Sequence, residues 1–266
     1  MSVIVECRLR VLHIILNRPE KRNALNAEMC SRIVTEIESA QVREDVGAIL
    51  ISALGHVFCS GMDLDQAAGD ISQDALAHIH DDLFSIGANS IKPVLVCVNG
   101  SALGGGLGLV AQGHIVIAAQ GAGFGLPEVR VGLWPFLVYR AVEAALGPRR
   151  TLELSLTGRV FHSHEAQLWG LVQHVGPGSE VLDRAQLMAR DLAKSSPLAI
   201  SAGMRYVKGA RGKAWKEAGE IACELRTQLL HGPDFKEGYE AFKEKREPRW
   251  PSMPEMFYSE RDGPSE

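Results

Sequence analysis

The spacing of hydrophobic residues predicts strands and short helices in the first part of the chain. Apolar residues alternate with polar ones through residues 3–16 on either side of Arg8-Leu-Arg10, which predicts a β-hairpin. Short, continuous apolar runs predict buried strands at residues 48–52, 93–98 and 115–119. Helical spacing predicts helices at residues 29–37, 75–86 and 135–146, and residues 65–70 have the composition of a loop.

The pattern changes after Gly147, where nearly every segment has helical spacing or composition. We expect helices at residues 152–156, 163–170, 181–193, 199–207, 214–230 and 235–247. Strand–turn–helix units followed by a helical tail predict an α/β fold with a helical C-terminal subdomain. We place the boundary near residue 195, which gives a core of residues 1–195 and a helical region of residues 196–266.

Two glycine-rich stretches each follow an apolar strand. They are Phe58-Cys-Ser-Gly-Met-Asp-Leu64 and Val98-Asn-Gly-Ser-Ala-Leu-Gly-Gly-Gly-Leu-Gly-Leu109. A strand that runs into a glycine turn and then a helix presents backbone N–H groups where the helix dipole favours negative charge. Two such turns side by side can direct two N–H donors at one oxygen atom. The stretches therefore predict an oxyanion hole and chemistry at a carbonyl group.

Composition and charge limit the class of protein. The chain has 266 residues, of which 46% are hydrophobic and 23% charged, as is typical of a soluble globular protein. A net charge of −4 without a dominant basic face argues against nucleic-acid binding. The five cysteines are scattered without a C-x-x-C pair, which favours free, mostly buried thiols in a reducing compartment. Because the N-terminus carries no signal or transit pattern, we expect a cytoplasmic protein.

Residues 93–119 form the one segment apolar enough to be considered as a membrane span. Asn99, Gln112, His114 and several glycines interrupt it. We therefore interpret the segment as two buried strands flanking a buried helix, and expect no association with a membrane.

Three further patterns suggest chemistry but have simpler interpretations. Gly106-Leu-Gly-Leu-Val-Ala111 matches a dinucleotide-binding fingerprint, but its first glycine lies well past the strand and inside a predicted helix. Ser60 and Ser101 lie outside a G-x-S-x-G motif, which argues against acyl hydrolysis. Two groups have the side chains of metal ligands: His78, His80, Asp81 and Asp82, and separately His162 and His164. Since residues two apart on a helix do not share a face, we interpret both groups as surface polar residues and expect no metal site.

Six motifs, in order along nearly the whole chain, resemble the crotonase superfamily, the enoyl-CoA hydratase/isomerase family. They are Leu16-Asn-Arg-Pro-Glu-Lys-Arg-Asn-Ala-Leu25, Phe58-Cys-Ser-Gly-Met-Asp-Leu64, Asn99-Gly-Ser-Ala-Leu-Gly-Gly-Gly106, Phe124-Gly-Leu-Pro-Glu128, Leu156-Thr-Gly-Arg159 with residues 166–172, and Glu237-Gly-Tyr-Glu-Ala-Phe-Lys-Glu-Lys-Arg-Glu-Pro248. The resemblance implies a spiral of ββα turns, a C-terminal trimerisation region, and assembly into homotrimers or hexamers. It also implies an acyl-CoA thioester substrate, whose oxygen would lie between the N–H groups of Met62 and Gly105.

The same resemblance implies one catalytic carboxylate in this chain, where the best-known family members have two. Family hydratases of the best-known kind use two glutamates, and only the second is present here, as Glu128, because Gly108 occupies the first position. Family members that resemble 3-enoyl-to-2-enoyl isomerases use a single glutamate at the Glu128 position, and one carboxylate is sufficient for a 1,3 proton shift. Members similar to methylglutaconyl-CoA hydratases also carry a glycine at the Gly108 position. We therefore favour isomerisation slightly over hydration by one glutamate.

Resemblance also assigns the residues that would bind coenzyme A, which would enter as part of the substrate and not as a resident cofactor. Arg22 and Ala24 would lie near the pantetheine and adenine, and Leu64 beside the acyl arm. Phe242 and Lys245 would contact the 3′-phosphate region, from a neighbouring subunit in one arrangement. Basic residues near both segments give this an electrostatic rationale.

Two interpretations of the remaining residues stay open. Trp134 and Phe136 would either add bulk beside the acyl pocket together with Gly108, or simply pack the start of the following helix. For the whole protein, the alternative from another class is a non-catalytic acyl-CoA-binding protein, which kept the oxyanion hole and lost turnover with the glycine at position 108.

Overall fold

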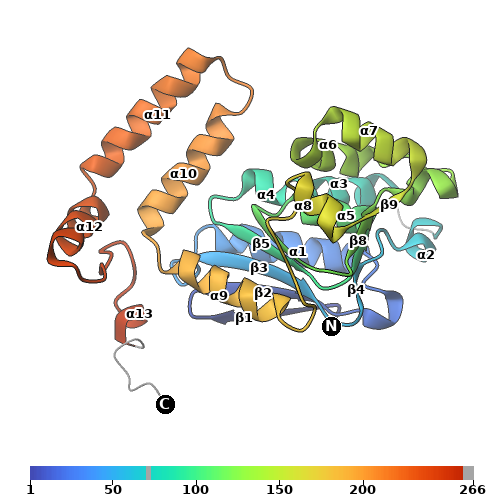
Figure 1. Cartoon of the computed structure of the whole chain (residues 1–266), viewed down its shortest axis with the longest axis horizontal. Helices are drawn as coiled ribbons and strands as arrows, with labels where there is room; N and C mark the ends of the chain where they lie inside the picture. The colour runs from blue at the N-terminus through green and yellow to red at the C-terminus, as the bar shows by residue number, and fades with distance from the viewer. Residues whose placement is uncertain (70–72, 260–266) are drawn as a thin grey trace.

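A computed structural model describes residues 1–69 and 73–259, and its centre is a six-stranded sheet (Figure 1). The strand order is β1-β2-β3-β5-β7-β10. The bounds are Val3–Arg8 (β1), Val11–Leu16 (β2), Ala48–Ala53 (β3), Val94–Val98 (β5), Ile115–Ala119 (β7) and His174–Gly176 (β10). β1 and β2 form the predicted hairpin, with Arg8 opposite Val11, and the other neighbours in the sheet run parallel.

A second sheet of four short strands was not predicted. It contains β4 (Val57–Cys59), β6 (Ser101–Leu103), β8 (Gly123–Gly125) and β9 (Val160–His162) in that order. Strands of three residues, two of them beside glycine turns, are too short to show a two-residue period. The expectation that the chain is purely helical after Gly147 is therefore wrong, because β9 and β10 both follow it. Each β3/β4, β5/β6 and β7/β8 pair gives one strand to each sheet, and this repeat is the predicted spiral.

Alternation along the parallel strands divides the core into two layers. In β3, Ile49 and Ile51 face the larger cluster, which fills the space between the sheets and α1. Ala48 and Leu50 face the other side, where α9 (Val181–Ala193) covers the sheet with a row of alanines. Residues 93–119 lie inside this core, where β5, α5 (Gly105–Ala111) and β7 are the predicted strands and helix, and β6 is a strand that was not predicted. Within the described part of the chain, no helix combines the length and apolarity needed to cross a bilayer.

Several helices around the core begin at a side-chain cap or a proline. α1 (Ala27–Ala40) begins after Asn26, whose side chain accepts a hydrogen bond from the Met29 N–H at 2.9 Å. Residues 65–67 belong to helix α2 (Leu64–Ala67) and do not form the predicted loop, because the Asp63 side chain accepts a hydrogen bond from the Gln66 N–H. Asp70, at the end of the predicted loop, lies outside the described residues. The remaining bounds are Pro19–Lys21 (η1), Gln73–Leu83 (α3), Ile86–Asn89 (α4), Pro127–Val131 (η2), Phe136–Leu146 (α6), Pro148–Thr157 (α7) and Ser163–Leu168 (α8).

Four helices follow the core: α10 (Pro197–Ala210), α11 (Trp215–Leu230), α12 (Pro233–Glu244) and α13 (Met256–Ser259). The first three agree with the predicted helices within a few residues. Figure 1 shows α10 and α11 as an antiparallel pair that stands to one side of the sheets, with α12 beyond them. Trp250 fastens the end of this region to the core, since its indole N–H donates to the Lys194 carbonyl oxygen at 2.7 Å.

Close packing of α5 on β4 generates a testable prediction about stability. A Cβ atom on Gly106 would lie 2.4 Å from the Cys59 carbonyl oxygen, so we expect Gly106→Ala to lower the free energy of unfolding by about 1–3 kcal/mol, despite the helix preference of alanine. Gly121, which has open space around it, is the matched control, and Gly121→Ala should be neutral or raise that free energy by up to about 1 kcal/mol. Urea unfolding of both variants measures the difference. Equal stabilities would contradict the packing described.

Candidate active site

The turn that contains Met62 is held in place by backbone pairing with a preceding loop. The Leu25 N–H donates to the Gly61 carbonyl oxygen at 2.8 Å, and the Asp63 N–H donates to the Leu25 carbonyl oxygen at 2.9 Å. In such a parallel bridge, Leu25 forms hydrogen bonds with the backbone of Gly61 and Asp63, the residues on either side of Met62. The N–H of Met62 itself therefore points away from Leu25. Gly61 has φ +103°, a conformation that favours glycine.

Two side chains, one fully buried and one partly buried, fix the loop that carries Leu25, and neither was predicted to have a role. Asn23 is fully buried with φ +53°, and its amide donates to the carbonyl oxygens of Leu54 and Val57 at 2.9 and 2.8 Å. Arg18 pairs with Asp63 at 2.9 Å and donates to the Ala24 carbonyl oxygen at 2.7 Å. Both residues lie in the first family-like motif, where only Arg22 and Ala24 were assigned a role.

The second glycine turn approaches the first through backbone atoms. A Cβ atom on Gly61 would lie 3.0 Å from the Leu103 carbonyl oxygen and 3.5 Å from the Gly105 nitrogen, and one on Gly105 would lie 3.7 Å from the Met62 nitrogen. The N–H of Gly104 donates a hydrogen bond to the Gly125 carbonyl oxygen at 2.9 Å. In contrast, within the described part of the chain the N–H groups of Met62 and Gly105 have no hydrogen-bond partner. Two unpaired donors thus lie close together in the described structure.

Glu128 lies directly beside this pair of turns. It belongs to η2, which follows strand β8, and its Oε1 is 2.9 Å from the position of a Cβ atom on Gly104. Its Oε2 is buried, and no described residue hydrogen-bonds to it. Burial therefore raises the pKa of the Glu128 carboxyl above its ordinary value, although a backbone hydrogen bond acts in the opposite direction. A buried carboxyl group with a shifted pKa in a largely apolar cavity is typical of functional sites.

Gly108 has no room for any side chain. A Cβ atom there would lie 2.8 Å from Cε1 of Phe84 and 2.9 Å from Cγ1 of Val138. The space above the glycine is therefore filled by an aromatic ring and a methyl group. A carboxylate at this position would require both neighbours to move, so the absence of the first glutamate is built into the packing.

The turns, Glu128 and Phe84 surround one cavity of about 500 Å³, which is within the usual range for a small-molecule site. Of the predicted site residues, Met62, Gly105, Glu128, Leu64, Trp134 and Phe136 line it. Its wall is mostly apolar and also includes Leu25, Ser60, Gly61, Ala77, His80, Gly104, Pro127, Arg130, Val131, Leu133, Pro135, Leu137 and Val138. Phe136 is 77% exposed and Leu64 51%, so these two lie at its open side.

The other predicted binding residues lie outside the cavity wall. Arg22 is exposed and Ala24 buried in the loop just before Leu25, and Gly108 is packed beneath Phe84. Phe242, in α12, is 81% exposed, and Lys245 follows the end of that helix with φ +56°. Figure 1 shows α12 on the opposite side of the molecule from α2. Within one chain, the last two residues are therefore not brought to the cavity.

His80 differs from its predicted surface position. It is 5% exposed, lines the cavity, and stacks on Phe84 with ring centroids 6.2 Å apart. The prediction was wrong because helical spacing did not reveal that this face of α3 packs towards the core. His78, His162 and His164 are exposed, as expected. Among the described residues no group of histidine, cysteine or acidic side chains is arranged to hold a metal ion.

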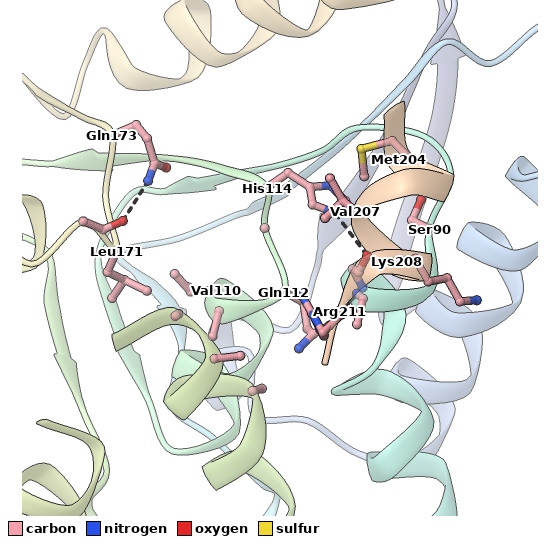
Figure 2. A pocket seen from close by; sticks show the side chains of 18 residues that line it. Ser90, Val110, Gln112, His114, Leu171, Gln173, Met204, Val207, Lys208 and Arg211 are labelled. Carbon is pink, nitrogen blue, oxygen red and sulfur yellow. Dashed lines mark hydrogen bonds between the residues drawn. The ribbon is translucent and has the colours of Figure 1, made fainter. Parts of the chain in front are cut away.

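A second cavity of about 260 Å³ lies between the core and α10 (Figure 2). Met204 and Lys208 reach it from α10, Arg211 from the residue just after α10, and His114 and Gln112 from the core. The two core side chains are already paired. The Val94 N–H donates to Nδ1 of His114, which leaves Nε2 to donate to the Gly87 carbonyl oxygen at 3.0 Å, and Gln112 Oε1 accepts from the Gly87 N–H at 2.9 Å. These side chains connect structural elements, and none of the predicted site residues lies here.

Comparison with known proteins agrees with this geometry. The enoyl-CoA hydratase/isomerase family model matches residues 6–253. The chain is 32% identical to 2,3-dehydroadipyl-CoA hydratase of Escherichia coli K12 over 252 residues, which covers 93% of this chain and 97% of the relative. It is also 32% identical to an enoyl-CoA hydratase of Mycobacterium tuberculosis H37Rv, covering 94% and 96%.

Solved structures show the same fold. An enoyl-CoA hydratase of Mycobacterium smegmatis superposes with a TM-score of 0.89 at 25% identity, over 94% of this chain and 99% of the other. An enoyl-CoA hydratase subunit of Geobacillus kaustophilus superposes with a TM-score of 0.86 at 30% identity, over 95% and 98%. The chain is a crotonase-fold enzyme and belongs to the enoyl-CoA hydratase/isomerase family, whose members act on acyl-CoA thioesters.

Proposed function

We propose that this enzyme moves a double bond in an enoyl-CoA thioester through an enolate, with Glu128 as its only carboxylate acid and base. The observation that carries the proposal is the packing at Gly108, where Phe84 and Val138 occupy the space that a second carboxylate would need. The unpaired N–H groups of Met62 and Gly105 would bind the thioester oxygen. In acyl-transfer enzymes, the loss of one such donor costs about 2.7–4 kcal/mol of transition-state stabilisation.

One carboxylate is sufficient for the complete proton cycle. Ionised Glu128 removes a proton from C2 of a 3-enoyl-CoA, and the electron pair of that C–H bond passes into a dienolate. The negative charge on the thioester oxygen is stabilised by the two N–H donors. Protonated Glu128 then returns the proton to C4, which leaves the double bond between C2 and C3. Burial raises the pKa of the Glu128 carboxyl, which is the direction that favours acid–base catalysis near neutral pH.

Hydration of a 2-enoyl-CoA by the same glutamate is the second candidate. It is favoured by the names of the relatives, which are hydratases. In that reaction Glu128 would take a proton from water as the oxygen attacks C3, and then protonate C2. We still prefer isomerisation, because hydration also requires that a water molecule be held and deprotonated, which two carboxylates do more easily than one.

The helical region supports assembly into a homotrimer or a hexamer. α11 has no buried residue, and Trp215, Tyr239 and Phe242 expose large apolar surfaces on α11 and α12. Such surfaces are typical of sites covered by another protein chain. We further propose that Phe242 and Lys245 reach coenzyme A on a second copy of the chain, while Arg22 and Ala24 contact it from the same copy. No resident cofactor or metal is part of the proposal.

Glu128→Gln provides the test of the reaction. With 3-enoyl-CoA as substrate, we expect wild type to form 2-enoyl-CoA at unchanged mass, and Glu128→Gln to be slower by a factor of about 10²–10⁴. Product mass spectrometry measures turnover, and uptake of solvent deuterium at C2 of the substrate or C4 of the product measures the proton transfers. Glu38→Gln, on the exposed face of α1, is the control and should retain full activity.

The other outcomes separate the alternatives. A gain of the mass of one water molecule from 2-enoyl-CoA, lost in Glu128→Gln, would establish hydration in place of isomerisation. Tight binding of an acyl-CoA without deuterium uptake at C2 would identify a non-catalytic binding protein and contradict the proposal.

Burial of Glu128 also predicts a pH-dependent stability difference. A carboxyl whose pKa is raised in the folded state favours folding below its unfolded pKa of about 4.5, and this contribution is lost as the pH rises through the folded value. We therefore expect Glu128→Gln to be more stable than wild type at neutral pH, and the difference to vanish at acidic pH. Urea unfolding at several pH values measures it, with Glu38→Gln as control. A Glu128→Gln variant that is less stable at neutral pH would contradict the unpaired, buried carboxylate.

A further inference from the structure

Cys59, the last residue of β4, has a bond to the turn that carries Met62. The Gly61 N–H donates to Sγ of Cys59 at 3.4 Å. Both residues are buried, and within the described part of the chain this sulfur is the only acceptor for that N–H. Burial raises the pKa of the thiol to about 12, so the group is neutral at neutral pH. An apolar side chain could not satisfy this buried N–H.

The sulfur also decides which N–H of the turn stays free. The N–H groups of Ser60 and Asp63 donate to carbonyl oxygens elsewhere in the protein. Because Cys59 accepts from Gly61, only the N–H of Met62 is left without a partner among the described residues. Without the sulfur, the turn would have a second free donor next to Met62, and the peptide group before Gly61 would lose the bond that fixes its orientation.

The same residue contacts the second turn. A Cβ atom on Gly106 would lie 2.4 Å from the Cys59 carbonyl oxygen and 2.9 Å from its Cβ atom, so the two residues pack directly on each other. Gly106 follows Gly105, whose N–H is the other unpaired donor. Cys59 is thus bonded to the residue before one donor and packed on the residue after the other. A shift of this one residue would change the relative position of both donors.

We propose that Cys59 is a positioning residue for the oxyanion hole, and that its sulfur fixes the direction of the Met62 N–H relative to the Gly105 N–H. The inference rests on the proposed function, since it takes these two groups to bind the thioester oxygen. Cys59 itself does not line the cavity. Its contribution is largest in the transition state, when negative charge develops on the oxygen, so its loss should lower kcat more than it changes KM.

Two substitutions test the role of the sulfur. With 3-enoyl-CoA, we expect Cys59→Ala to lower kcat roughly tenfold, less than the 10²–10³-fold cost of removing a donor outright, and to change KM less than twofold. Cys59→Ser should recover most of the lost kcat, because its hydroxyl oxygen accepts the same hydrogen bond. If the alanine variant does not fold, Cys59→Val, which fills the space without an acceptor, takes its place.

Cys97→Ala is the matched control. Cys97 is also buried, in the parallel strand β5, but it belongs to the layer that α9 covers, and its thiol has no hydrogen-bond partner among the described residues. Its removal should lower the free energy of unfolding in the same way as the loss of any buried side-chain atom, while kcat stays at the wild-type value. Urea unfolding of all variants measures this contribution.

A spectroscopic measurement separates positioning from folding. For bound hexanoyl-CoA labelled with ¹³C at the thioester carbon, the C=O stretch should move towards its aqueous frequency in Cys59→Ala. It should stay at the wild-type value in Cys59→Ser and in Cys97→Ala.

The outcomes distinguish this inference from the proposed function. The inference alone fails if folded Cys59→Ala keeps the wild-type kcat and stretch, if Cys59→Ser loses as much kcat as Cys59→Ala, or if Cys97→Ala loses as much. If wild type does not convert 3-enoyl-CoA but lowers the stretch, isomerisation fails and the stretch alone decides the role of Cys59. If wild type does not bind hexanoyl-CoA, or binds it without lowering the stretch, both fail.

Discussion

Direct contact between two backbone turns is the constraint on which the site depends. The turn at Gly61 and the turn at Gly104 and Gly105 meet without side chains between them, and a Cβ atom on Gly61 would already be 3.0 Å from the Leu103 carbonyl oxygen. Only this closeness can bring the N–H groups of Met62 and Gly105 to a single oxygen atom. The spiral produces the contact, because β4 and β6 are parallel neighbours and each turn follows one of them. Pairing of Leu25 with the first turn, secured by Asn23 and Arg18, then fixes its orientation.

Burial around these turns gives the site its electrostatic character. Glu128 and His80 line the same cavity, each has one buried atom without a partner, and burial shifts the pKa of each towards the uncharged form. In a largely apolar cavity, the two N–H donors would act more strongly on a developing negative charge than they would in water. Phe84 connects these features, since it packs over Gly108, approaches Gly105 and stacks on His80. The side chains of Phe84 and Val138 thus fill the space beside Gly108 that a larger residue would occupy.

Much of this arrangement could be predicted from the sequence, because its main signals are local. Apolar runs revealed the parallel strands, and glycines after them revealed the turns that carry Met62 and Gly105. What could not be predicted depends on contacts between distant segments. The strands of the second sheet are too short for a periodic pattern, and helical spacing in α3 did not show that His80 and Phe84 would face the cavity. Likewise, no local pattern indicates that Phe84 and Val138, far apart in sequence, fill the space above Gly108.

The central claim is that the N–H groups of Met62 and Gly105 together hold the oxygen of a bound thioester. Infrared difference spectroscopy of hexanoyl-CoA labelled with ¹³C at the thioester carbon measures this directly, because the C=O stretch falls in frequency as its oxygen accepts stronger hydrogen bonds. We expect a stretch at lower frequency in the complex than for the same ligand in water. A bound ligand whose thioester stretch stays at its aqueous frequency, or rises above it, would contradict the account.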